Sequence, residues 1–106
     1  MQIYQKSGSH LFCGHWNGSP VEIGVTETLL EVPSTEQLHY HNYHEYYVIL
    51  EGSGVLEVDN NPVVLEAGTT VMVHPGEQHR VIQVGENGIR WVIIKERSEP
   101  NSKHVV

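Results

Sequence analysis

Histidine is frequent in this chain, and it is concentrated in one short segment. Eight of the 106 residues are histidines, three of them between positions 39 and 44. His39, His41 and Glu45 have the same parity, so one regular strand would present all three on one face, whereas His44 would face elsewhere. Two imidazoles and a carboxylate are costly to bury without a partner, and a divalent transition metal would supply one. A solvated histidine-rich loop explains this cluster equally well.

A second segment offers another imidazole far along the chain. Residues 68–79 contain Gly68, a short apolar run, the turn signal Pro75-Gly76 and then His79, which opens the next predicted strand. If the strands close into a barrel, His79 can reach the first cluster across it. This second segment therefore favours a metal site over a solvated loop.

The elements that must position these residues are predicted to be strands. Glycine and proline interrupt the chain every eight to fifteen residues, and the stretches between them are rich in Val, Ile, Thr and Tyr, which favours short strands in a sandwich or barrel. We expect a bend within residues 38–50 and a turn at 59–62. Residues 85–88 are predicted to be a hairpin loop joining strands 79–84 and 89–95. Glu22 is expected on the solvated side of its strand.

Size and charge restrict the possible functions. The length suits a single domain spanning residues 1–106. Thirteen acidic and six basic residues give a net charge of −7, which argues against nucleic-acid and anionic-membrane partners. The single cysteine excludes an internal disulfide and a CxxC metal site. No apolar stretch approaches the roughly 20 residues of a membrane span, and no secretory signal is visible, so a cytoplasmic protein is expected.

The two histidine segments resemble the two signature motifs of the cupin superfamily. His39-x-His41-x3-Glu45-x6-Gly52 matches the first motif at all four diagnostic positions. Gly68-x5-His74-Pro75-Gly76-x2-His79 is similar to the second motif. Two positions depart from the family pattern: His74 stands where a proline usually begins Pro-x-Gly, and Gln83 replaces the usual asparagine four residues after the last histidine.

The resemblance implies a fold and a metal site. The fold would be an all-β, double-stranded β-helix, that is, a jelly-roll barrel. The implied ligands of one divalent transition metal per chain (Zn, Fe, Mn, Ni or Cu) are His39, His41, Glu45 and His79. These four ligands would leave one or two coordination positions open, as catalytic metal sites require. Metal binding is expected to fail below about pH 6, where free histidines protonate.

Three further side chains are candidates for catalysis. His74 could act as an acid or base near neutral pH, although its ring could equally lie at the rim of the barrel. Tyr47 could donate a hydrogen bond to a substrate oxygen, or simply fill the barrel wall. Gln83 lies four residues after His79 and could point into the barrel.

Three functions are compatible with these features. The first is a mononuclear metalloenzyme acting on a small polar metabolite, of dioxygenase, isomerase or lyase type. The second is a non-catalytic module that binds a sugar or another small molecule. The third is a metal-free cupin, which the intact ligand set argues against. The resemblance also implies a homodimer, in which an N-terminal arm (residues 1–19) and a C-terminal tail (98–106) are irregular or lie at the interface.

Overall fold

The computed structural model of the chain describes residues 1–6, 10–28 and 37–106. Within these ranges the regular structure consists of eight strands and one turn of 3-10 helix, so the all-β prediction is confirmed. In chain order the elements are β1 (Leu11–Cys13), η1 (His15–Asn17), β2 (Glu22–Thr28), β3 (His39–Tyr40), β4 (Glu45–Val58), β5 (Asn61–Glu66), β6 (Thr70–Val73), β7 (His79–Lys95) and β8 (His104–Val105). No helix in the described part is long and apolar enough to cross a membrane.

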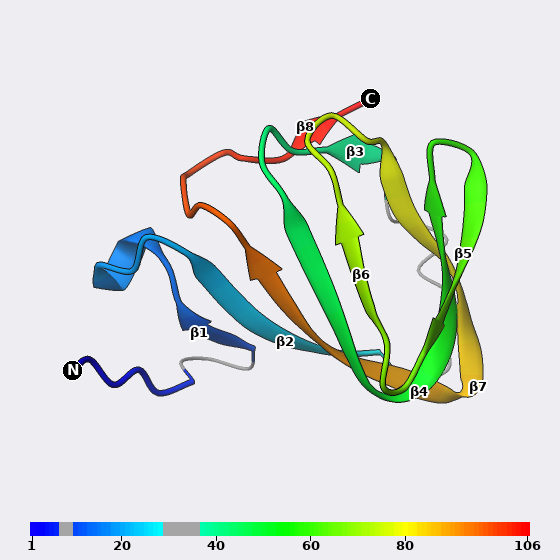
Figure 1. Cartoon of the computed structure of the whole chain (residues 1–106), viewed down its shortest axis with the longest axis horizontal. Helices are drawn as coiled ribbons and strands as arrows, with labels where there is room; N and C mark the ends of the chain where they lie inside the picture. The colour runs from blue at the N-terminus through cyan, green and yellow to red at the C-terminus, as the bar shows by residue number, and fades with distance from the viewer. Residues whose placement is uncertain (7–9, 29–36) are drawn as a thin grey trace.

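Two long, bent strands organise a curled antiparallel sheet (Figure 1). β4 and β7 pair along almost their whole length, from Glu45 opposite Lys95 to Val58 opposite His79. The first part of β4 also pairs with β6 and its second part with β5. β7 pairs with β3 at its beginning and with β2 at its end. Because both long strands continue through the bend, the two halves of the sheet enclose one interior.

The core fills the interior of the curled sheet. In the first part of β4, residues 45, 47 and 49 are buried and alternate with more exposed neighbours, as the two-residue period of a strand requires. The buried apolar cluster consists of Tyr47, Ile49, Leu56, Leu65, Val73, Val81, Val84, Ile89 and Trp91. The ring of Tyr47 in this core lies 6.2 Å from the ring of His79, centroid to centroid, so the core adjoins the histidines described below.

One predicted bend and one predicted turn are confirmed. The expected bend within residues 38–50 separates β3, which ends at Tyr40, from β4, which begins at Glu45. The turn at 59–62 joins β4 to β5, with Val58 opposite Asn61. Asp59 and Asn60 have φ values of 47° and 69°. Asp and Asn tolerate this left-handed conformation, which two-residue hairpin turns require.

The predicted hairpin loop at residues 85–88 is wrong. β7 continues through these residues, which form an insertion between Val84 and Ile89, the partners of Gly54 and Gly52 on β4. β4 runs alongside and pairs with both flanks, so the chain bulges and continues instead of reversing. Gly52 has φ +76°, and a β-carbon there would collide with the carbonyl of Gly88. The bend of the sheet therefore needs glycine at this crossing.

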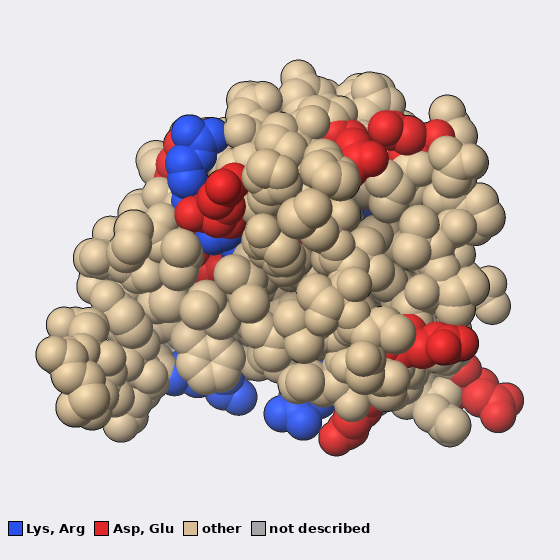
Figure 2. All heavy atoms as spheres, viewed as in Figure 1, with Lys and Arg blue, Asp and Glu red and all other residues tan. Residues whose placement is uncertain are grey.

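Both ends of the chain contribute regular structure to the sheet. The N-terminal arm contains β1, which pairs with β2, and η1; the C-terminal tail contains β8, which pairs with β3. Neither segment is irregular throughout its described length, and their expected place at a dimer interface stays a prediction. On the face seen in Figure 2, charged side chains gather in small groups and most of the surface is uncharged.

Candidate metal centre

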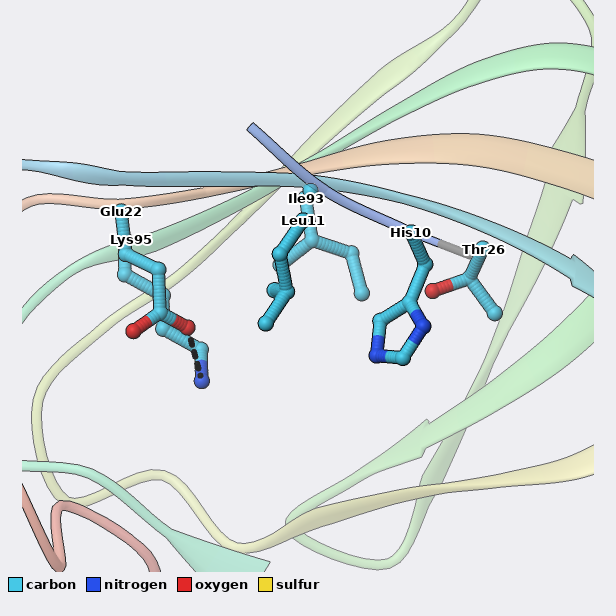
Figure 3. Close-up of a pocket in the computed structure, with 7 residues that line it drawn as sticks. His10, Leu11, Glu22, Thr26, Ile93 and Lys95 are labelled. Carbon is cyan, nitrogen blue, oxygen red and sulfur yellow. Dashed lines mark ion pairs between the residues drawn. The ribbon is translucent and has the colours of Figure 1, made fainter. Parts of the chain in front are cut away.

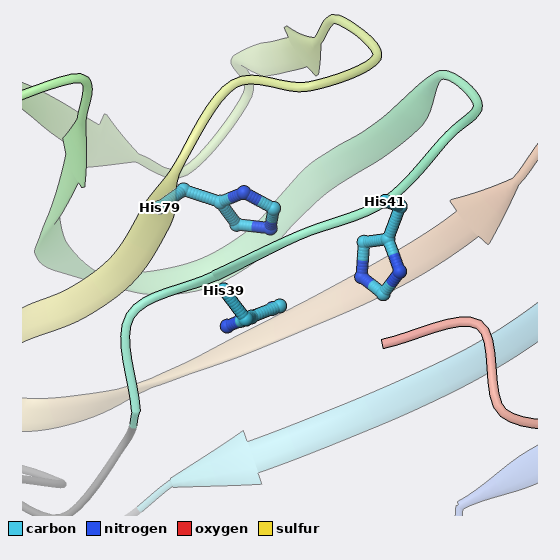
Figure 4. A group of neighbouring side chains, drawn as sticks. All are labelled: His39, His41 and His79. Carbon is cyan, nitrogen blue, oxygen red and sulfur yellow. The ribbon is translucent and has the colours of Figure 1, made fainter. Parts of the chain in front are cut away.

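Three histidines converge in the interior from two distant parts of the chain (Figure 4). His39 lies in β3, His41 in the loop that follows it, and His79 at the start of β7. β3 pairs with β7 so that His39 lies opposite His79. All three residues are buried, and each offers a ring nitrogen within 4.8 Å of the nitrogens of the other two. The predicted meeting of the two segments is confirmed, but it occurs between neighbouring strands, where His39 pairs with His79, and not across the barrel.

Each of the three rings is oriented by a backbone carbonyl. The Nδ1 atoms of His39, His41 and His79 lie 2.8, 2.8 and 2.9 Å from the carbonyl oxygens of Gln37, Ser102 and Glu77. A carbonyl oxygen only accepts hydrogen bonds, so these contacts assign the proton to Nδ1 and leave a lone pair on Nε2. Histidines that bind a metal through Nε2 are held in this way by their other nitrogen.

The carboxylate of Glu45 lies against two of these rings. Its Oε1 is 3.1 Å from Nε2 of His79, and its Oε2 is 3.5 Å from Nε2 of His41. With Nδ1 protonated, each Nε2 is an acceptor like the carboxylate oxygen, so a proton or a cation must lie between them. Neighbouring ligands about 2.1 Å from a metal are roughly 3.0 to 3.4 Å apart in octahedral or tetrahedral geometry. The 3.1 Å contact falls in this range and the 3.5 Å contact lies just outside it, so Glu45 stands beside the three-histidine group.

The hydroxyl of Tyr47 supports this carboxylate. It donates a hydrogen bond of 2.6 Å to Oε1 of Glu45, and both side chains are buried. Tyr47 therefore faces the site, as the sequence analysis allowed, but its hydroxyl is engaged by a neighbouring residue. Its role in the described structure is to position Glu45.

The protonation states suit a cation ligand set. Burial lowers the pKa of His39 to about 4 and also lowers the pKa of His41. Burial opposes ionisation of Glu45, but its contacts with His79 and Tyr47 outweigh this and hold its pKa at about 2. At neutral pH the imidazoles of His39 and His41 are neutral and Glu45 is ionised, the forms that bind metals. Burial therefore lowers the pH at which protons occupy His39, and the loss of metal binding below about pH 6 stays a prediction.

The other two motif histidines lie outside this interior. His44 faces away, as predicted, and its Nδ1 lies 2.9 Å from Oε2 of Glu96. The side chain of His74 is 57% exposed, and its Nδ1 lies 3.0 Å from Oε1 of Glu77. The rings of His44 and His74 are 5.6 Å apart. His74 therefore occupies the rim, the second of the two places considered for it.

Gln83 does not point into the barrel, so that expectation is wrong. Residues four apart share a face only in a regular strand. In the structure Val55 pairs with Gln83 but Leu56 pairs with Val81, so β7 contains one extra residue at this point. Such a bulge reverses the alternation beyond it. Gln83 is consequently exposed, while Val84 is buried.

Sequence reasoning also missed a pair of charged residues on the interior face. Glu22 was expected in solvent, but its Oε2 lies 3.0 Å from Nζ of Lys95, and their side chains are only 17% and 23% exposed. Lys95 follows directly after the apolar run 91–94. A lysine directly after an apolar strand could have indicated a buried charge. The pairing of Lys95 with Glu22 on the neighbouring strand, which shows the partner of that charge, cannot be predicted from the sequence.

Comparison with known sequences identifies a family. Residues 27–95 match the model of the cupin domain. A curated protein of Methanocaldococcus jannaschii, described as uncharacterised, is 32% identical over 66 residues. That match covers 61% of this chain and 53% of the relative, so the chain spans about half the length of the relative.

Comparison with solved structures identifies the same fold. A cupin protein from Bacteroides fragilis superposes with a TM-score of 0.72 and 20% identity, over 94% of this chain and 89% of the other. A cupin family protein with a double-stranded β-helix fold from M. jannaschii gives 0.72 and 14%, over 92% and 91%. A Bacillus subtilis oxalate decarboxylase variant gives 0.73 and 14%, over 98% of this chain and 30% of the enzyme. The predicted double-stranded β-helix is confirmed.

Proposed function

This chain belongs to the cupin domain family, and on that premise we propose that it is a mononuclear metalloenzyme acting on a small polar metabolite. The proposed ligands of one divalent transition metal are His39, His41, His79 and Glu45. The observation that carries the proposal is the buried three-histidine group in which every Nδ1 is held by a backbone carbonyl. A solvated histidine-rich loop would not need three such contacts.

The donor set is suited to Zn, Fe, Mn, Ni or Cu, because imidazole and carboxylate ligands fit these ions. When bound, the metal would supply Lewis-acid or redox chemistry at one or two open positions. The chain's own residues hold the ligands: the backbone carbonyls fix the rings, and Tyr47 fixes Glu45. Reactions of dioxygenase, isomerase and lyase type all suit such a site. One fold neighbour is an oxalate decarboxylase, but likeness of fold does not transfer its reaction.

A non-catalytic module that binds a sugar or another small molecule is the second candidate. It is favoured by the positions of the residues considered for acid–base catalysis. His74 and Gln83 are exposed, and the hydroxyl of Tyr47 is engaged by Glu45. A binding module needs only the cavity and the metal, whereas an enzyme also needs a group that moves protons or an activated oxygen.

Elemental analysis of the untagged protein tests the metal site. We expect about one equivalent of a single transition metal, lost in the variants His39→Ala, His41→Ala and His79→Ala and reduced less in Glu45→Gln, whose amide oxygen can still coordinate. His44→Ala is the matched control, because His44 lies in the same segment but faces away. Full metal content in any of the three alanine variants would remove that ligand from the proposal. Loss of metal in His44→Ala would show that the ligand register is wrong.

The metal found separates the two functions further. Iron would favour oxygen-dependent catalysis, whereas zinc, manganese or nickel would be compatible with an isomerase, a lyase or a binding module. Failure to take up any metal on reconstitution would leave a metal-free binding barrel.

We also propose that the protein forms a homodimer in the cytoplasm and has neither nucleic acid nor a membrane as a partner. Support for the dimer comes from the outer face of the sheet, where one row across four strands is apolar. The row consists of Ile23, Ile94, Tyr46 and Met72. Light scattering at several protein concentrations tests it: a monomer throughout would exclude the dimer.

A further inference from the structure

A row of three charged side chains crosses the interior face beside the candidate metal centre. Residues directly opposite one another on antiparallel strands point to the same face, with β-carbons about 4.5–5.5 Å apart. Lys95 of β7 lies opposite Glu45 of β4 on one side and opposite Glu22 of β2 on the other. Because Glu45 points into the interior, Lys95 and Glu22 share that face with it.

Two residues of this row, Lys95 and Glu22, line a hollow (Figure 3), whereas Glu45 and the three histidines are not among its lining residues. Its volume is about 250 Å³, close to the lower end of the range for small-molecule pockets. Glu22, Lys95, His10 and Thr26 give it polar walls, and Leu11 and Ile93 give it apolar ones. In Figure 3 these side chains project into the same space from β1, β2 and β7 and, for His10, from the residue before β1. The hollow has room for a metabolite and begins one strand away from Glu45.

Lys95 provides a fixed positive charge in this hollow. Burial acts to lower the pKa of Lys95, but its ion pair with Glu22 and the nearby Tyr43 and Glu45 raise it overall. The ammonium has three N–H donors. Within the described part of the chain its one ion-pair partner is Glu22. Donors therefore remain for a ligand in the hollow.

The charge of the whole site favours an anion once a metal is bound. A divalent cation outweighs the carboxylate of Glu45, and Glu22 balances Lys95. The remaining net charge is positive, and it lies in a buried site where Coulomb interactions are strong. Without the metal the two carboxylates exceed the single ammonium, so an anion would be repelled.

We propose that the hollow binds a small organic acid with oxygen donors at both ends, one end coordinating the metal and the other, a carboxylate, bound by Lys95. This inference rests on the metal site of the proposed function and adds its substrate class. Adjacent strands are about 4.8 Å apart, so an acid of about three to five carbons, its carboxyl carbons included, has the length to reach from one strand to the next. Glu22 positions Lys95 and competes with the ligand for its ammonium.

Calorimetric titration of the metal-loaded protein tests this with dicarboxylates of increasing length. The probes are malonate, succinate and glutarate, each compared with its monoamide, which keeps one carboxylate for the metal but offers none to Lys95. We expect at least one dicarboxylate to bind about ten- to a hundredfold more tightly than its monoamide, the effect of one charge-assisted hydrogen bond. The metal-free protein should not show this preference.

Three variants assign the preference to Lys95. Lys95→Met should abolish the preference for the dicarboxylate while metal content stays at the wild-type level. Glu22→Gln should strengthen it, because the ammonium loses its competitor. In Lys95→Met the carboxylate of Glu22 loses its partner, which could prevent folding. The double variant Glu22→Gln/Lys95→Met removes both charges together, so the preference for the dicarboxylate can still be measured in it.

The outcomes separate this inference from the proposed function. Metal uptake with no measurable dicarboxylate binding, or with a preference that survives in Lys95→Met or the double variant, would overturn the role of Lys95 and leave the metal site intact. Failure of the wild-type chain to take up metal would instead overturn the proposed function and the inference with it.

Discussion

Tyr47→Phe, which removes only the hydroxyl of Tyr47, should lower the stability of the metal-free protein more than the loss of one surface hydroxyl would. The hydroxyl donates a 2.6 Å hydrogen bond to the buried, ionised carboxylate of Glu45. A hydrogen bond to a charged group contributes about 1.5–3 kcal/mol, and Tyr47→Phe leaves the carboxylate without it. The ring itself stays, so no large cavity adds to the loss. We expect the free energy of unfolding to fall by about 1.5–3 kcal/mol.

Urea denaturation of the chelator-treated protein measures this loss. Tyr46→Phe is the matched control, because Tyr46 is the neighbouring tyrosine on the opposite, half-buried face of the same strand. Surface changes of this kind are usually within about 0.5 kcal/mol. In the Glu45→Gln background the cost of Tyr47→Phe should shrink, because the charge is gone. Equal losses in Tyr47→Phe and Tyr46→Phe would refute the argument that Tyr47 supports the carboxylate.

Two other properties follow from the geometry. The metal-free protein should lose stability as pH falls from about 6.5 to 4, because His39 and His41 take up protons there in the unfolded chain but not in the folded one. Protonation of Glu45 should add a further loss of stability between about pH 4.5 and 2. Urea denaturation midpoints across this pH range measure both losses. Gly52→Ala should lower the thermal denaturation midpoint more than Gly68→Ala does. Both glycines have positive φ, which costs alanine about 1–2 kcal/mol, but of the two only Gly52 also faces a backbone carbonyl that a β-carbon would hit.

The sequence predicted the parts of the structure that depend on local pattern. His39, His41 and Glu45 are all buried in the interior, as their common parity predicted, although a bend separates β3 from β4. The turn at 59–62 follows from residues that tolerate a left-handed backbone. The resemblance to cupins implied that His79 would join them, and no local rule could have shown that His39 and His79 face each other.

The errors have a common physical cause, which is pairing between distant strands. A glycine-rich segment at 85–88 has the composition of a hairpin loop, but β4 pairs on both sides of it and the strand continues. The bulge before Gln83 turns its side chain outward, and only the register with β4 shows that bulge. The position of Glu22 also depends on strand register. An acidic side chain is usually exposed to solvent, and only the pairing of β2, β7 and β4 shows that Glu22 lies in one row with Lys95 and Glu45.

The partner of His41 also bears on how the site is completed during synthesis. The carbonyl that holds its Nδ1 belongs to Ser102, 61 residues later in the chain, whereas the carbonyls for His39 and His79 are each two residues away. At about 5–20 residues per second, a ribosome needs several seconds to make the intervening segment. A nascent chain that ends before residue 102 would therefore hold all three imidazoles but lack the carbonyl that orients His41, and full metal affinity would arise only after residue 102 has left the ribosome.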